Sequence, residues 1–590
     1  MKFKIQNLKF KIKETGFDID DLIKALLFNR GIKTKKEIEE FLNPKLESVT
    51  TRNVGINSKE LQKAITRMQK AIKNKEKIVV FGDYDVDGIC GTAILWETLN
   101  SLGARAMPYI PHRVEEGYGL SVKGIQNVIM SSHPELGSGS RFRNKFGMTN
   151  NQVQHDNKKK LIITVDNGIV ANKAVEFANE QGINVIITDH HVPSKKLPKA
   201  YAIVHTTKLC GAGVVWMLTQ EIENRKLKIG DGNGKWKMEN GKYLELVTLA
   251  TVADLVPLIG ANRTLVKFGL EQLRQTKRVG LLELFKEAVL DKNEVGVYEI
   301  GHVIAPRLNA MGRLDYAMDS LRLLCTNNRE RAKKLADTLG STNKERQALT
   351  IETTEHAKSE VRSQKLEVRR LLFVSDESYQ QGVIGLVAGK LVEEFYRPAI
   401  VVSKGEKYSK ASARSVSGFN IIEFIRGASE LLVDAGGHPM AAGFTVETSK
   451  LSILQKTLEE KAEELLDEEK LTRTLRIDCE LPLSIVDSKL YQDIQKLSPF
   501  GMGNPEPTFV SRNVEIEEMR LVGAERRHIK FRFKIYDLRF MIDGIGFGMG
   551  ERANEFRIGD KVDVVYTIDK DEWNGNERLQ LKVKDLRRQH

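Results

Sequence analysis

Cysteine and long hydrophobic runs are both scarce in this 590-residue sequence. Its four cysteines are scattered without paired spacing, which argues against a disulfide framework and against a zinc ribbon. No apolar run approaches the roughly 18 residues that a membrane span needs. The opening residues, MKFKIQNLKFKIKE, also lack the apolar core of a signal peptide. We therefore expect a cytoplasmic protein that makes no contact with a membrane.

The rest of the composition is that of a globular protein, not of a disordered or fibrous one. Hydrophobic residues make up 41% of the chain and charged residues 29%. A chain of 590 residues is long enough for about three to five domains. The formal net charge of +13 favours a polyanionic partner such as nucleic acid, because cationic side chains on phosphates release counterions. Many basic proteins bind no nucleic acid, so charge alone leaves this open.

Hydrophobic patterning predicts an α/β protein with a separate β-barrel. Buried-strand patterns alternate with helical ones over most of the chain, as in βαβ units with a parallel sheet. A charged stretch without proline, from Asn328 to about Arg370, predicts a long solvated helix or a pair of helices between two α/β lobes. Two polar stretches, 137–160 and 231–243, are expected to be surface insertions. The predicted divisions are a helical lead-in at 1–75, a first α/β domain at 76–327, a connecting helix at 328–370, a smaller α/β domain at 371–465 and a nucleic-acid-binding barrel at 466–590.

Alternation with a period of two predicts the barrel. Ile529, Phe531, Phe533 and Ile535 alternate with polar residues, and further runs of this kind, with a hairpin signal at 574–575, suit the five strands of an OB-fold. Basic residues before and within the same strand would contact the backbone of a nucleic-acid strand. They are Arg527, Lys530, Arg532 and Lys534. The alternative is an ordinary solvated face of a sheet.

Acidic and imidazole side chains follow three of the predicted buried strands. Asp83, Asp85 and Asp87 follow IVVFG, Asp166 follows LIITV, and Asp189, His190 and His191 follow NVIIT. Because the carboxyl ends of parallel strands meet at one edge of a sheet, these groups should converge there. A single aspartate would more often cap the next helix, but three alternating carboxylates repel each other unless a cation is present. The imidazoles favour Mn²⁺, Zn²⁺ or Fe²⁺ over Ca²⁺.

A further acidic residue, Asp254, lies in the almost wholly apolar helix pattern LVTLATVADLVPL. A carboxylate buried in such surroundings needs a cation or hydrogen bonds to stay ionised, which makes it a candidate ligand. Five candidate ligands are enough for two divalent ions if one carboxylate bridges them, as in two-metal phosphoryl chemistry. They are Asp83, Asp85, Asp166, His190 and Asp254.

This ordered set of motifs resembles the DHH/DHHA1 phosphoesterase superfamily and, within it, the RecJ-type single-strand-specific DNA exonucleases. GDYDVDG at 82–88, VDNG at 165–168, DHH at 189–191 and VADLVPL at 252–258 are similar to the four phosphoesterase motifs of that family. CGAG, PRLNAMGR, GVIGLVAGKL, SARS, GGHPMAAGF and SPFGMGNPEP also follow it, so that the similarity covers nearly the whole chain. A DHH triplet alone would be weak; the ordered set is specific.

The resemblance implies a parallel-sheet DHH domain, a smaller DHHA1 domain and an OB-like barrel. It implies a processive 5′ to 3′ exonuclease that releases mononucleotides with two Mn²⁺ or Mg²⁺ ions, in DNA repair and recombination. The five candidate ligands would bind metal with Asp166 as the bridge, and His191 would face the scissile phosphate. Asp189 would orient the histidine pair, while Asp87 would either bind metal or hold its loop. The implied partners are single-stranded DNA and, as candidates, a helicase and a single-strand-binding protein.

Several family motifs supply candidates for binding the strand. The GGH turn next to SARS would cradle a phosphate, because glycine allows close approach and backbone N–H groups and arginine are donors. A glycine turn needed only for packing is the alternative for the GGH motif, and scattered surface arginines are the alternative elsewhere. The candidates are Arg113, Arg307, Arg313, Ser412, Arg414, Gly436, Gly437 and His438.

The chain departs from the family pattern at two places. Phe81 stands where many members have histidine, and Tyr379-Gln380 stands where Trp-His is usual. Two other functions also remain open. A DHH phosphodiesterase acting on oligoribonucleotides or cyclic dinucleotides is one, although such relatives are generally shorter and lack the terminal barrel. A non-catalytic replication scaffold is the other, although the intact aspartate and histidine set counts against it.

Overall fold

A computed structural model of the chain describes residues 2–5, 18–113, 115–117, 119–130, 160–226, 241–534, 541–573 and 576–589. Ile535, the turn at 574–575 and nearly all of the two predicted insertions, at 137–159 and 231–240, lie outside these ranges. The chain divides into two compact units. The larger unit is Lys45–Ser415 with Asn420–Lys461, and the smaller unit is Met1–Pro44 with Val416–Phe419 and Ala462–His590.

A five-stranded parallel sheet forms the centre of the first part of the larger unit, called here the parallel-sheet lobe (residues 45–327). Its strand order is β3-β2-β4-β5-β6, with every neighbouring pair parallel. The strands are β2 (Lys77–Phe81), β3 (Arg105–Tyr109), β4 (Lys160–Val165), β5 (Asn184–Asp189) and β6 (Ala202–His205). Ile78 and Val80 enter one hydrophobic cluster, and Val79 and Phe81 enter another. The sheet is therefore buried on both faces, as its unbroken apolar runs predict.

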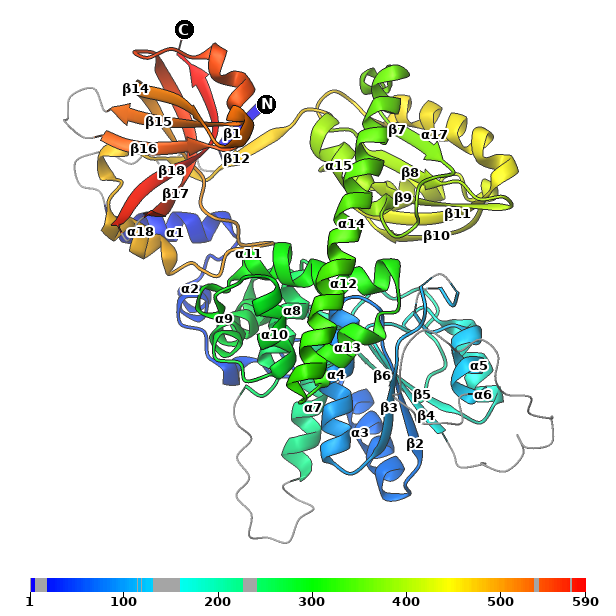
Figure 1. The fold of residues 1–590 in the computed structure, drawn as a ribbon. Helices are drawn as coiled ribbons and strands as arrows, with labels where there is room; N and C mark the ends of the chain where they lie inside the picture. The colour runs from blue at the N-terminus through cyan, green and yellow to red at the C-terminus, as the bar shows by residue number, and fades with distance from the viewer. Residues whose placement is uncertain are drawn as a thin grey trace. The chain divides into compact units, whose positions relative to one another are not determined.

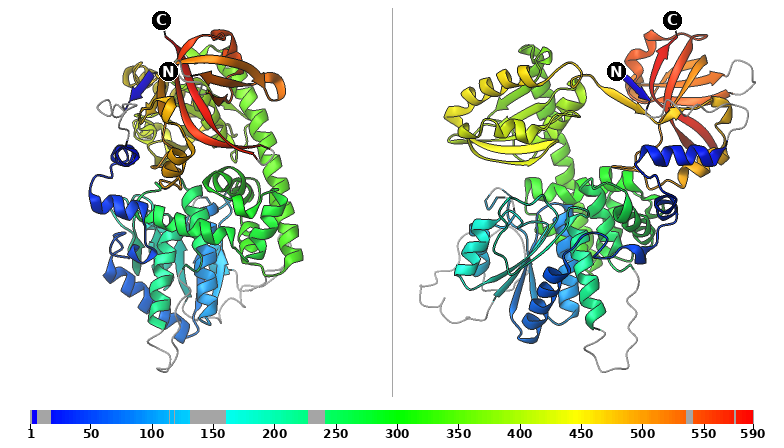
Figure 2. Two further views of the ribbon diagram at one scale, coloured as in Figure 1. Left: turned by 90° about the vertical axis from the view of Figure 1, so that its left-hand side faces the viewer. Right: turned by 180° about the vertical axis from the view of Figure 1, so that it is seen from behind.

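Helices cover both faces of this sheet. Figure 1 shows α3, α4 and α7 on one side and α5 and α6 on the other, and the view from behind in Figure 2 agrees. The helices are α3 (Ser58–Lys73), α4 (Val86–Ser101), α5 (Val122–Met130), α6 (Asn172–Glu180) and α7 (Gly211–Lys226). This is the doubly wound arrangement of an α/β domain, and it confirms the predicted fold class for this part of the chain.

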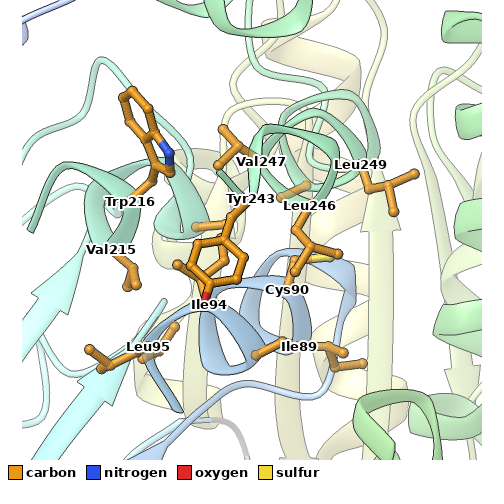
Figure 3. Close-up of a cluster of buried hydrophobic side chains, with 14 of the residues drawn as sticks. Ile89, Cys90, Ile94, Leu95, Val215, Trp216, Tyr243, Leu246, Val247 and Leu249 are labelled. Carbon is orange, nitrogen blue, oxygen red and sulfur yellow. The ribbon is translucent and has the colours of Figure 1, made fainter. Parts of the chain in front are cut away.

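Helix α4 packs against α7 and α8 (Leu244–Ala253). Figure 3 shows apolar side chains from these helices meeting in one cluster. The labelled members are Ile89, Cys90, Ile94 and Leu95 of α4, Val215 and Trp216 of α7, and Tyr243, Leu246, Val247 and Leu249 at or within α8. Because α4 begins inside the GDYDVDG motif, this packing fixes the motif relative to α7 and α8.

A helical region completes the parallel-sheet lobe and leads into a long helix. Its elements are α9 (Gly260–Arg274), α10 (Val279–Glu287), α11 (Val297–Glu299), a π-helical segment (Ile300–Ile304), α12 (Ala305–Leu314), α13 (Met318–Cys325) and α14 (Arg329–Ser363). Helix α14 has 35 residues. Ala332, Ala336 and Leu339 join the core of the parallel-sheet lobe, whereas Ala357 and Val361 join the core of the next lobe. The predicted connecting helix is thus confirmed.

The second part of the larger unit is called here the mixed-sheet lobe (residues 364–415 and 420–461). Its strand order is β10-β11-β9-β8-β7, in which only β7 and β8 are parallel. Its elements are β7 (Leu372–Asp376), α15 (Ile384–Phe395), β8 (Ala399–Ser403), β9 (Tyr408–Arg414), α16 (Ile421–Arg426), β10 (Leu432–His438), β11 (Ala441–Glu447) and α17 (Leu451–Leu465). Helices α14 and α15 pack on β7 and β8 in one hydrophobic cluster.

The smaller unit contains a closed barrel. The order β14-β15-β16-β18-β17 closes because β17 pairs back onto β14, and Ile529, Phe531 and Phe533 point into its core as predicted. Its elements are β1 (Lys2–Ile5), α1 (Ile19–Asn29), α2 (Lys35–Leu42), β12 (Thr474–Ile477), β13 (Cys479–Glu480), α18 (Ser488–Gln495), β14 (Phe509–Val522), β15 (His528–Lys534), β16 (Met541–Gly546), β17 (Lys561–Trp573) and β18 (Asn576–Arg588).

The first 75 residues, predicted as one helical lead-in, divide between the two units. Leu22 and Leu26 of α1 pack into the hydrophobic cluster of the barrel, and β1 pairs with β12. Helix α3 instead packs on the parallel sheet. Nothing local in the sequence distinguishes these two destinations. In the described part of the chain, no helix combines the length and the apolar character needed to cross a membrane.

Candidate metal centre and strand-binding residues

The acidic and imidazole residues gather where the parallel strands end. Asp83 lies two residues after β2, Asp166 directly follows β4, and Asp189 is the last residue of β5. Strands β2 and β4 are neighbours in the sheet although β3 separates them in the chain. The strand order reverses at this point, and ligands of open α/β sheets bind in the crevice that such a reversal opens. Asp83 and Asp166 flank that crevice.

The side chains form three groups that could each hold a metal ion, and within each group the ligand atoms lie within 4.8 Å of one another. The groups are Asp83, Asp85 and Asp166; Asp166, His190 and His191; and Asp87, His190 and Asp254. The Nε2 atom of His190 lies 3.1 Å from Oδ1 of Asp166 and 3.6 Å from Oδ2 of Asp254. Asp166 and His190 each belong to two groups. The structure therefore brings all five predicted ligands together.

Burial makes this cluster of carboxylates unfavourable without a cation. Burial and then the charge of Asp85 raise the pKa of the Asp83 carboxyl well above its usual value. Burial also raises the pKa of the Asp166 carboxyl well above its usual value, and the neighbouring carboxylates, of which Asp87 has the largest effect, raise it further. Oδ2 of Asp83 and Oδ1 of Asp166 are buried, and neither accepts a hydrogen bond from any residue in the described ranges, although Nε2 of His190 approaches Oδ1 of Asp166. Such oxygens fit a divalent ion, because a cation supplies both the missing partner and the compensating charge.

The backbone is shaped to admit these carboxylates. A Cβ atom on Gly88 would lie 2.6 Å from the Cβ of Asp83, and one on Gly211 would lie 2.7 Å from Oδ1 of Asp166. Asp166 itself has φ of +64°, a left-handed conformation that aspartate and asparagine adopt more readily than most residues. Strain of this kind concentrates at functional sites.

Asp85 and Asp87 also fix the helices around the centre. Asp85 caps the start of α4 by accepting a hydrogen bond from the N–H of Gly88 at 3.0 Å. The two oxygens of Asp87 accept hydrogen bonds from the N–H groups of Gly211 and Ala212, both at 2.6 Å. Asp87 thus holds the first turn of α7 against the motif, which is the loop-holding role that the sequence left open for it.

Asp189 holds the histidine pair. Its Oδ1 accepts a hydrogen bond from the backbone N–H of His190 at 2.7 Å. The same oxygen lies 2.8 Å from Nδ1 of His191. Burial alone would lower the pKa of His191, but the hydrogen bond and charge of Asp189 outweigh it and raise that pKa to about 9. On the other side, Nε2 of His205 lies 2.7 Å from the carbonyl oxygen of His191. His205 was not identified from the sequence, because a lone histidine at a strand end carries no motif.

Asp254 differs from the prediction in its surroundings. The apolar pattern predicts a buried carboxylate within a helix that ends near Pro257. In the structure α8 ends at Ala253, Asp254 caps its C-terminus, and 32% of its side-chain surface is exposed. Remaining burial and the charges of Asp87 and Asp85 still raise its pKa to about 8. Asp254 therefore closes the ligand cluster from the solvent side.

Four arginines lie close together in the larger unit, and they are called here the arginine group. They are Arg113, Arg313, Arg346 and Arg414. Burial and the positive charges of the other three lower the pKa of Arg313 to about 10. Among the residues that the structure describes, none of the four forms an ion pair with a carboxylate. Such a group fits an anion with several oxygens, such as a phosphate.

Secondary contacts fix the arginine group in place. The guanidinium of Arg113 lies 5.1 Å from the ring centre of Tyr84. In the chain, Tyr84 stands between the candidate ligands Asp83 and Asp85. Arg313 donates to the carbonyl oxygen of Gly382 at 3.2 Å. Arg346, on α14, donates to Asn343. Arg346 was missed because it lies in a charged helix without a motif.

Arg307 does not join the arginine group, although it shares α12 with Arg313. Its Nε donates to Oε2 of Glu287 at 2.6 Å, and its Nη1 donates to the carbonyl oxygen of Val303. Residues six apart on a helix point in different directions, so the common motif did not distinguish them. Arg307 thus forms an ion pair within the lobe.

The SARS and GGH motifs meet in the mixed-sheet lobe. Arg414 donates to the hydroxyl oxygen of Ser412 at 3.1 Å, and a Cβ on Gly385, at the start of α15, would lie 2.9 Å from that oxygen. Gly437 pairs with Ala442 across the β10–β11 hairpin, and Gly436 pairs with Gly443. The His438 ring stacks on that of His191, with centroids 5.9 Å apart. The motifs therefore face the ligand cluster.

The two departures from the family pattern are both accommodated by packing. The Phe81 ring is fully buried in the cluster that α5 and α6 cover, 5.1 Å from the ring of Tyr109. Position 81 thus supplies no imidazole to the ligand cluster. The buried Tyr379 hydroxyl lies 2.9 Å from Nδ1 of His356 on α14, which ties that helix to the mixed-sheet lobe.

The predicted basic strand of the barrel is balanced by acids. Lys530, Arg532 and Lys534 do alternate with buried residues along β15. However, Arg532 lies between Glu518 at 2.7 Å and Asp543 at 3.2 Å. The others lie near acids as well: Lys530 near Asp571, Lys534 near Glu517 and Arg527 beside Glu525. The acids near Lys530, Arg532 and Lys534 come from other strands, so the pattern of one strand did not reveal them, whereas Glu525 lies in the turn just before Arg527.

Three regions of the chain match known domain families. The DHH family N-terminal domain matches residues 77–251, the DHHA1 domain matches residues 364–467, and the RecJ OB domain matches residues 477–585. The single-stranded-DNA-specific exonuclease RecJ of Bacillus subtilis (strain 168) is 34% identical over 588 residues, which cover 98% of this chain and 69% of that protein. The protein of the same name from Escherichia coli (strain K12) is 29% identical over 611 residues, covering 99% and 100%.

Solved structures give the same result. The crystal structure of RecJ in complex with Mn²⁺ from Thermus thermophilus matches with a TM-score of 0.78 and 26% identity, covering 100% of this chain and 80% of that one. The corresponding structure with Mg²⁺ matches with a TM-score of 0.72 and 25% identity, covering 100% and 79%. Both cations suit the clustered carboxylate oxygens, and Mn²⁺ is also among the ions that the histidines favour here.

Proposed function

Because the chain belongs to the RecJ family of single-stranded-DNA-specific exonucleases, we propose that it degrades single-stranded DNA from the 5′ end to mononucleotides, with two divalent cations, Mn²⁺ or Mg²⁺. One observation carries the proposal: Asp166 and His190 are each shared between ligand groups at the strand-order reversal of the parallel sheet. A shared carboxylate is what a pair of metal ions requires. We assign Asp166 as the bridge, with Asp83, Asp85, His190 and Asp254 completing the ligand set.

When bound, the two cations would activate a water molecule and stabilise charge on the attacking and leaving oxygens. The protein contributes the positions of the groups around them. Asp189 holds Nδ1 of His191, which leaves Nε2 of that ring to face the scissile phosphate. The contact of Nδ1 with Asp189 at 2.8 Å supports this role, because it fixes the direction in which the ring faces.

The arginine group would hold the 5′ end of the strand. Arg113 and Arg313 supply charge next to the ligand loop, while Arg414 and Ser412 supply donors beside the first turn of α15, a helix of 12 residues. A helix N-terminus favours anions. This role is supported by the charge of the arginine group. Its four guanidinium groups have no carboxylate partner among the described residues, and they repel each other unless an anion is bound.

The proposal is tested by comparing three substrates in the presence of Mn²⁺. A long 5′-labelled single strand, the same strand in a duplex and a dinucleotide are incubated with the protein. We expect labelled mononucleotide to be the first product from the long single strand, with little from the duplex. An enzyme that degrades only the dinucleotide would instead be a small-substrate phosphodiesterase. Absence of any product would leave a non-catalytic protein.

In the cell, the proposed role is DNA repair and recombination. A 5′-end exonuclease specific for single strands needs another activity to separate the duplex. We therefore propose a helicase and a single-strand-binding protein as partners, and the cytoplasm as the place of action. Co-purification of either partner with the tagged full-length chain would test this.

A further inference from the structure

We propose that Glu116 is a positioning residue for Arg113, and that it thereby sets a preference of the enzyme for strands that end in a 5′-phosphate. Glu116 belongs neither to the ligand cluster nor to the arginine group. The inference rests on the proposed function, because it takes the 5′ end of the strand as the occupant of the arginine group. A terminal phosphate carries about 1.5 to 2 negative charges at pH 7, so well-placed guanidinium groups distinguish a phosphorylated end from a hydroxyl end.

Glu116 closes the turn that carries Arg113. Its backbone N–H donates a hydrogen bond to the carbonyl oxygen of His112 at 2.9 Å. Its Oε1 accepts a hydrogen bond from the backbone N–H of His112 at 3.1 Å. One residue therefore pairs with both backbone polar groups of His112, the residue directly before Arg113. These two contacts fix the backbone from which the Arg113 side chain extends.

The other carboxylate oxygen of Glu116 ties this turn to the parallel sheet. Oε2 accepts a hydrogen bond from the hydroxyl of Tyr109, the last residue of β3, at 2.6 Å. Burial and then this hydrogen bond raise the pKa of Tyr109, so its hydroxyl stays protonated and donates. The carbonyl oxygen of Tyr109 accepts a hydrogen bond at 2.9 Å from the N–H of Gly82, directly before the candidate ligand Asp83. Glu116 thus joins the position of Arg113 to the strand ends that carry the metal centre.

Glu116 positions Arg113 without neutralising its charge. No ion pair joins the two side chains in the described part of the chain, and the guanidinium lies against the ring of Tyr84 instead. Burial and then the charge of Arg113 lower the pKa of both Arg313 and Arg414. A carboxylate paired directly with Arg113 would compete with a phosphate. Here the carboxylate holds the backbone and leaves the guanidinium available to an anion.

The alternative is that Glu116 only stabilises its loop, as carboxylates that accept backbone N–H groups often do. A Glu116 variant would then lose stability, but strands with a 5′-phosphate and strands with a 5′-hydroxyl would be affected equally. The ratio of kcat/KM for these two substrates separates the two roles, because effects common to both substrates cancel in it.

Hydrolysis in Mn²⁺ of one long single strand, prepared with a 5′-phosphate and with a 5′-hydroxyl, measures this ratio. We expect Glu116→Ala to lower it about tenfold, the lower limit for one hydrogen bond to a charged group, through a higher KM for the phosphorylated strand. The kcat on the hydroxyl strand should keep its wild-type value. Glu115→Ala is the matched control, because Glu115 is exposed in the same turn and its side chain forms no hydrogen bond or ion pair within the described ranges.

A double-mutant cycle tests whether Glu116 acts through Arg113. If it does, Arg113→Ala and the double variant Arg113→Ala/Glu116→Ala should have equal ratios. Additive losses would overturn the proposal, and so would an unchanged ratio in Glu116→Ala.

Two conservative variants keep the test decisive if alanine at position 116 unfolds the loop. Tyr109→Phe removes only the hydroxyl and keeps the ring, which lies 5.1 Å from that of Phe81, and it should also lower the ratio. Glu116→Gln should retain most of the preference, because its amide oxygen accepts from His112 and its amide N–H donates to the Tyr109 oxygen. A wild-type ratio in Tyr109→Phe, or complete loss of the preference in Glu116→Gln, would contradict the assignment.

The wild-type protein separates failure of this inference from failure of the proposed function. If it cleaves the single strand but does not distinguish the two ends, the role of Glu116 is wrong and the exonuclease activity stands. If it cleaves no DNA, the proposed function fails and this inference fails with it, whatever the variants show.

Discussion

The side-chain oxygen of Asn309 accepts a hydrogen bond from the backbone N–H of Val86 at 3.0 Å. This contact joins α12 to the first residue of α4, directly after the proposed ligand Asp85. A Cβ on Gly312 would lie 2.5 Å from the carbonyl oxygen of Tyr84, so α12 also approaches the loop closely. The same helix carries Arg313 near its end. One helix thus positions both the metal ligands and part of the arginine group.

Asn309→Ala should weaken metal binding without removing a ligand. Loss of the acceptor leaves the N–H of Val86 unpaired and frees the loop that carries Asp85. Groups that orient ligands typically contribute about 10- to 100-fold to metal affinity. Calorimetric titration with Mn²⁺ measures the effect, and the Mn²⁺ dependence of the hydrolysis rate should shift in parallel. Asn309→Asp keeps an acceptor and should bind Mn²⁺ more tightly than Asn309→Ala; equal affinities would contradict the role.

Asp166→Asn should abolish turnover and leave strand binding largely intact. Asparagine tolerates the left-handed conformation at position 166, so this variant removes the charge without the backbone strain that alanine would add. A neutral amide cannot bridge two cations, and we expect kcat to fall by more than about a hundredfold. Binding of a long strand in EDTA should change little, because many cationic contacts share it. Parallel loss of affinity and activity would argue against this assignment.

The same variant should stabilise the metal-free protein. Burial and neighbouring carboxylates raise the pKa of Asp166, so its ionised form is unfavourable in the folded state. Replacing it with a neutral isostere removes that repulsion. The Tm of Asp166→Asn in EDTA at pH 8 should therefore exceed that of the wild-type protein. Thermal unfolding followed by circular dichroism measures the difference, and a lower Tm would show that the aspartate is not destabilising.

Strand ends and motif order were sufficient to predict the fold class and the family, which the comparisons confirm. The apolar runs before Asp83, Asp166 and Asp189 are local signals, and the rule that parallel strands end at one edge converts them into a site. The motif around Asp254 was sufficient to predict that this residue lies near the other candidate ligands. Its partial exposure could not be predicted, because the residue at which α8 ends depends on packing.

Contacts between distant segments could not be read from the chain. Arg346 belongs to the arginine group although its helix carries no motif. Arg307 lies outside the group and forms an ion pair with Glu287 instead. The cations of β15 looked uncompensated because their acidic neighbours lie on other strands. Each of these depends on tertiary position, which the local patterns of polar residues do not encode.

Gly211→Ala should disrupt the metal centre through one methyl group. The added Cβ would lie 2.6 Å from the Cβ of Asp166 and 2.7 Å from its Oδ1, closer than such atoms approach. Asp166 or the start of α7 must then move, and we expect loss of Mn²⁺ binding and of hydrolysis. Gly389→Ala is the control: it lies within α15 with nothing within 4 Å of its added Cβ. It should keep activity and gain about 0.5–1 kcal/mol of stability.

Stability of the metal-free protein should fall as the pH rises, and divalent cations should reverse this. Each raised carboxyl pKa means that the folded state binds a proton more tightly than the unfolded state. The resulting stability is complete below the ordinary value of 3.8 and is lost as the pH rises to the folded value, about 8 for Asp254. His191 acts in the same direction between its ordinary value of 6.5 and about 9.

Thermal unfolding in EDTA and in saturating Mn²⁺, each at pH 6 and pH 8, tests this linkage. Protons compete with the cation for the same oxygens, so Mn²⁺ should raise Tm more at pH 8 than at pH 6. Binding at saturation should add roughly 5 to 10 °C at the higher pH. The Asp166→Asn variant should lose most of that gain, because it lacks the shared ligand. A gain in Tm that is equal at both pH values, or unchanged in Asp166→Asn, would place the bound cation away from these carboxylates.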